Sequence, residues 1–289
     1  MGPALRRQTR SVANLAFVGF CWITTAIAVA ALACIFITLL QKGVAGVDLN
    51  VFILPTPAPG TTGGLGNAIL GSVVLSLIGM IIAVAVGVLA GTWLAEFGRN
   101  SLYAEVVRFL NDILLSAPSI LVGLFVYILL VKPFHGASAL AGGVALGLIA
   151  VPIITRTTED VLRLQPTALR EAGVALGTPL WTTIRKILWK SAGSGILTGA
   201  LLAFARISGE TAPLIFTAMN SQFYSLGLDK PYFGLNQEIA NLPVTIYQSA
   251  LSASDDLVSL AWTGSLIVAV AVLVANILAR FVTRERRSS

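Results

Sequence analysis

Charged residues are scarce in this sequence. Asp, Glu, Lys and Arg make up only 11% of its 289 residues, whereas a soluble domain carries about 25%. Hydrophobic residues reach 56%, and the uncharged apolar tracts are longer than the ~20 residues that cross a bilayer as a helix. So little charge cannot cover a water-facing surface. The composition therefore excludes a soluble domain and predicts an all-α integral membrane protein.

Cysteine and histidine are also rare. Cys21 and Cys34 lie in the first apolar tract without the spacing of a disulfide framework or a metal site, and His135 is the single histidine. The sequence lacks the Gly-Lys dipeptide of a phosphate-cradling ATPase loop and any nucleophile elbow. We therefore expect this chain to bind no metal or cofactor and to catalyse no reaction. The net charge of +6 forms no basic stripe with interleaved aromatics, so no nucleic acid partner is expected.

Six apolar tracts are long enough to span a membrane. They lie near residues 13–40, 67–95, 106–131, 138–155, 193–217 and 258–282. We expect one transmembrane domain over residues 13–283, preceded by a tail at 1–12 and followed by a basic tail at 284–289. Two connections are too long for simple turns: an inner one at 156–192 and an outer one at 218–257.

Positive charge is distributed unevenly about these spans. Of the 19 Lys and Arg residues, only Lys42, Lys132 and Lys230 fall on the side opposite the N-terminus, and Arg206 lies within a span. The other fifteen lie on the N-terminal side, since 19 less four is fifteen. Cytoplasmic segments of membrane proteins carry the excess of Lys and Arg. Both termini are therefore expected to be cytoplasmic.

Glycine and proline indicate how the helices pack and where they break. Two pairs, Gly87–Gly91 and Gly143–Gly147, have the small-xxx-small spacing that lets helix backbones approach closely in lipid. Proline removes a backbone donor and clashes with the preceding turn. Three prolines are expected to interrupt spans: Pro118, Pro152 and Pro213.

The inner connection contains a short helix between two breaks. Pro166 is expected to end the preceding helix, Gly177 to close the short one in a left-handed conformation, and Thr178-Pro179 to open the next. The apolar face of the short helix comprises Ala168, Leu169, Ala172, Ala175 and Leu176. Two interpretations fit this pattern: an amphipathic helix on the membrane surface, or an element that a cytoplasmic partner pushes.

This connection resembles a known motif. The stretch Glu171-Ala-Gly, followed by Gly177 and Ile187, is similar to the EAA loop of permease subunits of bacterial ABC importers, which docks as a coupling helix on the ATPase. The sequence departs from that pattern at Gly173, which replaces the second alanine, and at Trp189-Lys190, which replaces Leu-Pro. The resemblance implies that four residues couple the chain to an ATPase: Arg170, Glu171, Ala172 and Gly177.

Further stretches narrow the resemblance to one branch of these permeases. They are RTTE at 156–159, SAPSILVGLF at 116–125, ARISGETAPLIFTA at 205–218 and LPVTIY at 242–247. Together they resemble the PstA-type permeases of bacterial phosphate importers, over about residue 65 to the end. The resemblance implies a type I ABC importer permease fold in the inner membrane. It also implies a PstC-like second permease, a pair of PstB-like ATPases that bind ATP and Mg²⁺, and an extracytoplasmic PstS-like phosphate-binding protein.

Charged residues within the spans are the candidate pathway. Arg206 lies past the midplane of a ~30 Å core, where a charge costs about 2.5–3.5 kcal/mol on insertion scales. Glu210 lies one turn further on and within pairing reach. Arg156 and Glu159 repeat the arrangement three residues apart, and Arg108–Asp112 is expected to form an ion pair at a helix end.

Two interpretations of the membrane pairs remain open. One is a structural ion pair that locks helices together. The other is a guanidinium that meets a passing phosphate oxyanion, whose geometry it matches, while the carboxylate keeps binding weak enough for release. The resemblance favours transport, since Arg156, Glu159 and Arg206 match residues implicated in transport in that family; Glu210 is added from its helical spacing.

We therefore expect a permease subunit that forms half of the pathway of an ATP-driven phosphate importer. One alternative is a permease for another oxyanion such as sulfate, molybdate or phosphonate. A second is an ion-driven secondary transporter or channel, which the EAA-like loop and the lack of a convincing internal repeat disfavour. A third is a membrane scaffold that reports phosphate status.

Overall fold

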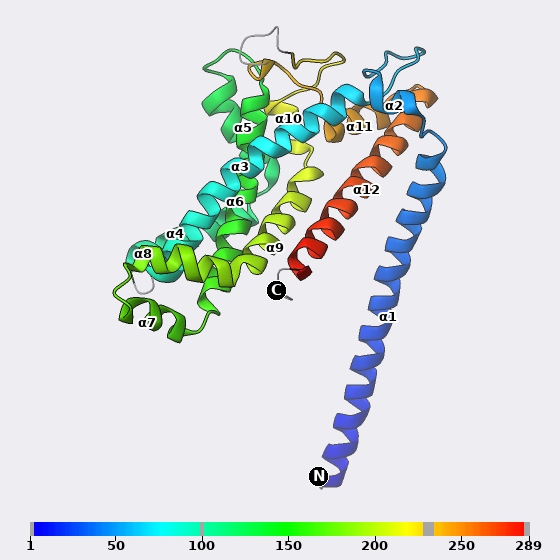
Figure 1. Ribbon diagram of the computed structural model, residues 1–289. Helices are drawn as coiled ribbons and strands as arrows, with labels where there is room; N and C mark the ends of the chain where they lie inside the picture. The colour runs from blue at the N-terminus through cyan, green and yellow to red at the C-terminus, as the bar shows by residue number, and fades with distance from the viewer. Residues whose placement is uncertain (1–2, 99–100, 228–233, 286–289) are drawn as a thin grey trace.

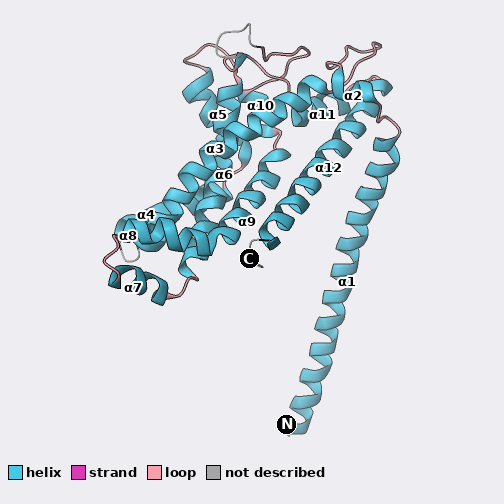
Figure 2. Cartoon of the chain, viewed as in Figure 1, coloured by secondary structure: helices cyan, strands magenta, loops and turns pink. Residues whose placement is uncertain are grey.

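The computed structural model describes residues 3–98, 101–227 and 234–285, and within these ranges the chain is built from helices and loops without strands (Figures 1 and 2). The α-helices are α1 Pro3–Val44, α2 Leu49–Ile53, α3 Gly66–Glu96, α4 Leu102–Ser116, α5 Ser119–Val126, α6 Ala139–Arg163, α7 Thr167–Ala175, α8 Leu180–Thr183, α9 Trp189–Ser208, α10 Ala212–Thr217, α11 Leu242–Ala250 and α12 Asp255–Glu285. Two short π-helices, η1 Tyr127–Val131 and η2 Ile184–Leu188, continue α5 and α8. The all-α fold expected from composition is confirmed.

The membrane spans agree with the six apolar tracts in number, with one difference in shape. Five helices in the described residues are long and apolar enough to span a bilayer, and a bent pair raises the number to six. In that pair α4 meets α5–η1 at a bend of 106°. The expected interruption of the span at 106–131 by Pro118 is therefore confirmed. Pro118 holds Ala117 in an extended conformation (ψ 135°) and ends α4 at the preceding turn.

Helix α1 begins at Pro3, so the expected tail at residues 1–12 is helical from residue 3, and the candidate membrane span begins at Ala13. Two other expectations are corrected by the structure. The outer connection at 218–257 is not a plain loop, because α11 and the start of α12 lie within it. Pro152 does not interrupt its span, since α6 runs through it. Lys230 and most of the basic tail at 284–289 lie outside the described residues.

Helices α3 and α6 form the centre of the bundle, and glycine lets them approach closely. A side chain at Gly87 would meet Ile154 Cβ at 2.8 Å, and one at Gly91 would meet Thr158 Cβ at 2.7 Å. From the other helix, Gly143 lies against Ile78 and Gly147 against Ile82. Both predicted small-residue pairs are therefore confirmed as packing surfaces of one interface. Dispersion contacts rather than water exclusion hold such an interface in lipid.

The first helix stands apart from the rest of the bundle (Figure 1). Helix α1 packs on α12 near its C-terminal end, where Gly43 lies against Leu266, but none of its most apolar window is buried. A helix that is apolar all round and unburied requires lipid or another membrane protein as its solvent. We call the end of the bundle that carries α7 the α7 end, and the end that carries α11 the α11 end.

Candidate functional site

The pair Arg206–Glu210 lies where α9 stops. Helix α9 ends at Ser208, and Glu210 follows in the three-residue link before α10. The Glu210 amide still donates to the Ile207 carbonyl (3.2 Å), so the helical turn continues far enough to bring the two side chains together as an ion pair. The predicted pairing is confirmed. Pro213, in the first turn of α10, confirms the expected interruption there.

The two partners of this pair differ in exposure. The Arg206 side chain is 54% exposed in the isolated chain, whereas the Glu210 side chain is 7% exposed. The carboxylate is therefore held among the helices, and the guanidinium faces outward from them. Such an arrangement leaves the cation accessible to an anion while a fixed negative charge limits how tightly that anion is held.

Arg156 lies on the neighbouring helix, at a different level. Helices α6 and α9 pack antiparallel, with Gly195 against Val161 and Gly199 against Thr157. This register places Arg206 level with residue 150, so Arg156 lies six residues, or about 9 Å, closer to the α7 end. The Arg156 side chain is 48% exposed and contacts Asp160 at 3.5 Å. The structure thus places two half-exposed guanidiniums on adjacent helices, each beside a carboxylate.

The predicted pairing of Arg156 with Glu159 is wrong. The Glu159 side chain is 3% exposed and forms ion pairs with Arg108 (2.8 Å) and Arg163 (2.7 Å), which ties α4 to α6. The expected Arg108–Asp112 pair is wrong for the same reason, because Arg108 turns inward and Asp112 is exposed. Three-residue spacing places Glu159 on the packed face of α6 and Arg156 on the open one. Glu159 therefore has the position of a helix-linking residue.

The inner connection has the predicted shape, with one shift. Gly177 follows α7 in the left-handed conformation (φ +72°), as expected. Pro179, and not Thr178, precedes the first residue of α8, so the next helix opens one residue later than predicted. Pro166 precedes α7 after α6 has ended at Arg163. The predicted apolar face is mostly uncovered: Ala172, Ala175 and Leu176 are exposed, with Leu176 at 83%.

Arg170 is held by the chain itself, unlike its neighbours. Its guanidinium donates twice to the Glu96 carboxylate at the end of α3, at 2.8 and 2.6 Å, and also to the backbone carbonyls of Gln165 and Leu162. Hydrogen bonding to Glu96 raises the pKa of Arg170 further above its usual value, so it stays protonated at every working pH. Glu171 and Ala172 are exposed on the other side of α7. Of the four predicted coupling residues, Arg170 therefore faces inward.

The two departures from the EAA pattern have a structural reason. A methyl group at Gly173 would collide with the Thr183 side chain, which is buried where α7 folds back on α8. Trp189 lies edge-on to Trp181 (5.6 Å between ring centroids) and donates its indole N–H to Thr92 of α3 at 3.0 Å. Gly173 therefore lets α7 pack closely on α8, and Trp189 ties the connection to α3.

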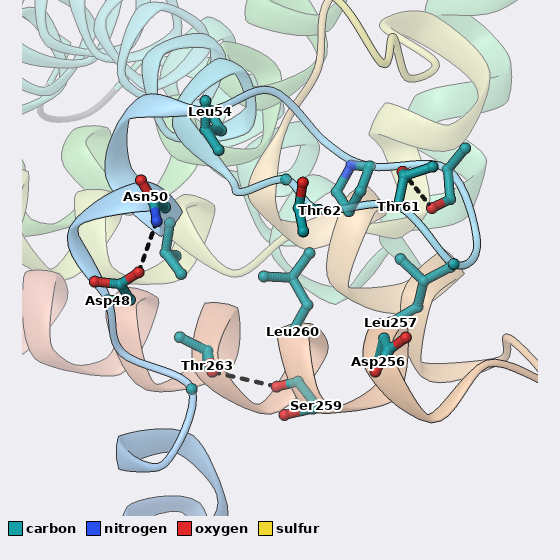
Figure 3. A pocket seen from close by; sticks show the side chains of 16 residues that line it. Asp48, Asn50, Leu54, Thr61, Thr62, Asp256, Leu257, Ser259, Leu260 and Thr263 are labelled. Carbon is teal, nitrogen blue, oxygen red and sulfur yellow. Dashed lines mark hydrogen bonds between the residues drawn. The ribbon is translucent and has the colours of Figure 1, made fainter.

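The pocket drawn in Figure 3 is not lined by any of these residues. This pocket of about 440 Å³ lies between the loop after α2 and the start of α12. Figure 3 shows Asp48 and Asp256 on opposite sides of it with Leu260 between them. No Lys or Arg is among the described residues that line it. Two carboxylates without a cation repel an oxyanion, so this pocket does not suit one.

The chain is similar to known permeases over most of its length. Residues 87–288 match the family described as binding-protein-dependent transport system inner membrane component. The phosphate transport system permease protein PstA of Haemophilus influenzae is 47% identical, over 98% of each chain. The chain belongs to this family, among its PstA-type permeases. The PstA of Yersinia pestis is 50% identical over 88% of this permease and 84% of that protein.

A solved structure supports the fold of the permease. A chain of the methionine ABC transporter MetNI, in an inward-facing conformation, superposes with a TM-score of 0.62 over 77% of this permease and 95% of that chain. Its sequence is 18% identical, so the likeness concerns the fold alone. The expected ABC importer permease fold is confirmed. Permeases of this family are not catalytic, and a separate subunit hydrolyses ATP.

The partners of three residues of the permease were not found from the sequence. Glu96, Arg108 and Thr92 each pair with a residue more than 50 positions away in the chain. A carboxylate at the last position of an apolar span is a weak signal for Glu96. No spacing rule identifies partners on different helices.

Proposed function

We propose that this permease forms half of the phosphate pathway of an ATP-driven importer in the bacterial inner membrane. The observation that carries the proposal is the identity of about half of all residues to permeases named for phosphate transport, over 98% of the chain in one case. The pair of half-exposed guanidiniums supports it, because a guanidinium stays charged and matches phosphate geometry. Both termini are cytoplasmic in this proposal, as the Lys and Arg distribution favours.

Phosphate would pass the two guanidiniums in turn. Arg206 would receive the anion near the α11 end, with Glu210 weakening its hold, and Arg156 would receive it about 9 Å further in, beside Asp160. A conducting path needs sites that attract an ion and still release it. At each site the guanidinium attracts the anion, and the carboxylate beside it keeps the binding weak enough for release.

The other subunits would complete the importer. The unburied α1 and the exposed guanidiniums suit a second, PstC-like permease, which would supply the other half of the path. A pair of PstB-like ATPases, carrying ATP and Mg²⁺, would meet the exposed side of α7 at Glu171, Ala172 and Gly177. A PstS-like binding protein would deliver phosphate at the α11 end.

Uptake of labelled phosphate by the assembled complex tests the role of Arg206. We expect Arg206→Gln to lower uptake about 10- to 150-fold, the range for a lost charged hydrogen bond of about 1.5–3 kcal/mol. Arg206→Lys keeps the charge but not the fork and should retain intermediate uptake. Lys132→Gln, an exposed cation elsewhere, is the matched control. If Arg206→Gln prevents assembly of the subunits, the pair is structural and the proposed role is wrong.

A further inference from the structure

Helix α7 is held to the bundle by side-chain hydrogen bonds as well as by the backbone that connects it to α6. Arg170 makes four hydrogen bonds of 2.6–2.9 Å, two to Glu96 and two to backbone carbonyls at the end of α6. Both side chains of the pair are largely buried, at 13% and 3% exposure. Two parallel N–H···O bonds between fork and carboxylate also fix orientation. Helix α7 is therefore clamped to both α3 and α6.

The same two helices hold the segment at the α11 end. Near the start of α3, Asn67 donates to the Ser221 carbonyl (3.0 Å), and Ser72 accepts from the Leu242 amide at the start of α11 (2.7 Å). At the start of α6, the amides of Ser138 and Ala139 donate to the carbonyls of Thr217 and Gln237. The described parts of the chain from the end of α10 to the start of α11 are thus hydrogen-bonded to both α3 and α6.

The α3–α6 pair is suited to carry a displacement between these ends. Helix α3 is unbroken over 31 residues, about 46 Å at 1.5 Å per residue. Close glycine packing joins it to α6 along its length. The route through α9 is less direct, because α9 ends at Ser208 before α10 begins. Packed helices shift as units rather than deform.

We propose that the Arg170–Glu96 clamp makes α7, α3 and α6 move as one body, so that a push on α7 reaches residues 218–227 and 234–241. Glu96 is then a positioning residue for coupling. It fixes α7 to the α3–α6 pair and need not touch the ATPase or phosphate. Arg170 has the same role, which replaces the direct contact with the ATPase expected from its motif. The inference builds on the proposed function, since it requires a motor that pushes α7.

The first test is the number of ATP molecules hydrolysed per phosphate imported by the assembled complex. Glu96→Gln removes the negative charge at nearly the same side-chain size. Arg170→Lys keeps the positive charge but cannot make the two parallel hydrogen bonds of the guanidinium. Each should raise this ratio by at least about fivefold, the lower range of measured coupling between sites. Glu105→Gln removes an exposed carboxylate on α4 and should leave the ratio unchanged. Parallel loss of hydrolysis and uptake at a constant ratio would mean that the clamp serves stability only, and would overturn the proposal.

The second test does not depend on phosphate import. Spin labels at Val174→Cys on α7 and Phe223→Cys near the α11 end, in a Cys21→Ser, Cys34→Ser background, report the distance between the two ends. We expect the same distance with and without nucleotide, and a broadened distribution in Glu96→Gln. A nucleotide-dependent change of distance in the unaltered clamp would show that α7 moves alone. If the complex imports no phosphate, the proposed function fails, and this measurement still decides on the clamp.

Discussion

At the residue scale, two neighbouring carboxylates on α6 have opposite environments. Glu159 is almost fully buried between Arg108 and Arg163, whereas the Asp160 side chain is 57% exposed beside Arg156. A buried carboxylate that loses its charge leaves its cationic partners uncompensated, whereas an exposed pair contributes little because water screens it. Stability should therefore depend on Glu159 far more than on Asp160.

Substitution of these two residues tests that difference. Glu159→Gln should lower the free energy of unfolding by about 2 kcal/mol, the range for hydrogen bonds to a charged group, and Asp160→Asn by less than about 1 kcal/mol. Chemical denaturation of the purified permease in detergent measures both. Equal losses for the two variants would contradict the helix-linking position of Glu159.

Helical spacing predicted some of these contacts and failed for others. Four-residue spacing was right for Arg206 and Glu210 because both lie on one turn, even though α9 ends between them. Three-residue spacing was wrong for Arg156 and Glu159 because α4 supplies a better partner from another helix. Residue spacing describes the surface of a single helix, whereas Glu159 is buried by the packing of α4 on α6.

At the element scale, the connection between α6 and α9 was predictable where proline and glycine control the backbone. Pro166 and Gly177 delimit α7 as expected, because one lacks a donor and the other accepts a positive φ. The 106° bend at Pro118 was predicted only as an interruption. After the bend, α5 packs through Gly123 on Pro213 of α10, a contact between residues far apart in the sequence that no local pattern predicts.

Gly177 offers a test of this element. Gly177→Ala places a side chain at φ +72° and should cost about 1 kcal/mol locally, which loosens the turn and raises ATP use per phosphate. Gly177→Asn should be closer to the parent, since Asn tolerates this conformation. Gly193→Ala is the control, because it lies in a helix with no atom near its missing side chain. A coupling ratio unaffected by Gly177→Ala would argue against a rigid turn.

At the scale of the whole molecule, hydropathy predicted most of the fold, because a bilayer requires every span to be a long apolar helix. The glycine pairs predicted close packing by the spans that became α3 and α6, but not that these two spans pack on each other. The separation of α1 from the bundle was not predictable. The apolar side chains of α1 can be covered equally by lipid or by a neighbouring chain, so their pattern does not show whether α1 packs against the bundle.

As a whole, this permease is expected to conduct phosphate only when a separate ATPase drives it. The most direct test is uptake of labelled phosphate into proteoliposomes that contain the purified complete complex and the loaded binding protein. We predict uptake that requires ATP on the side of α7, that excess unlabelled phosphate suppresses, and that excess sulfate leaves unchanged. Uptake without ATP, or equal suppression by sulfate, would contradict the account.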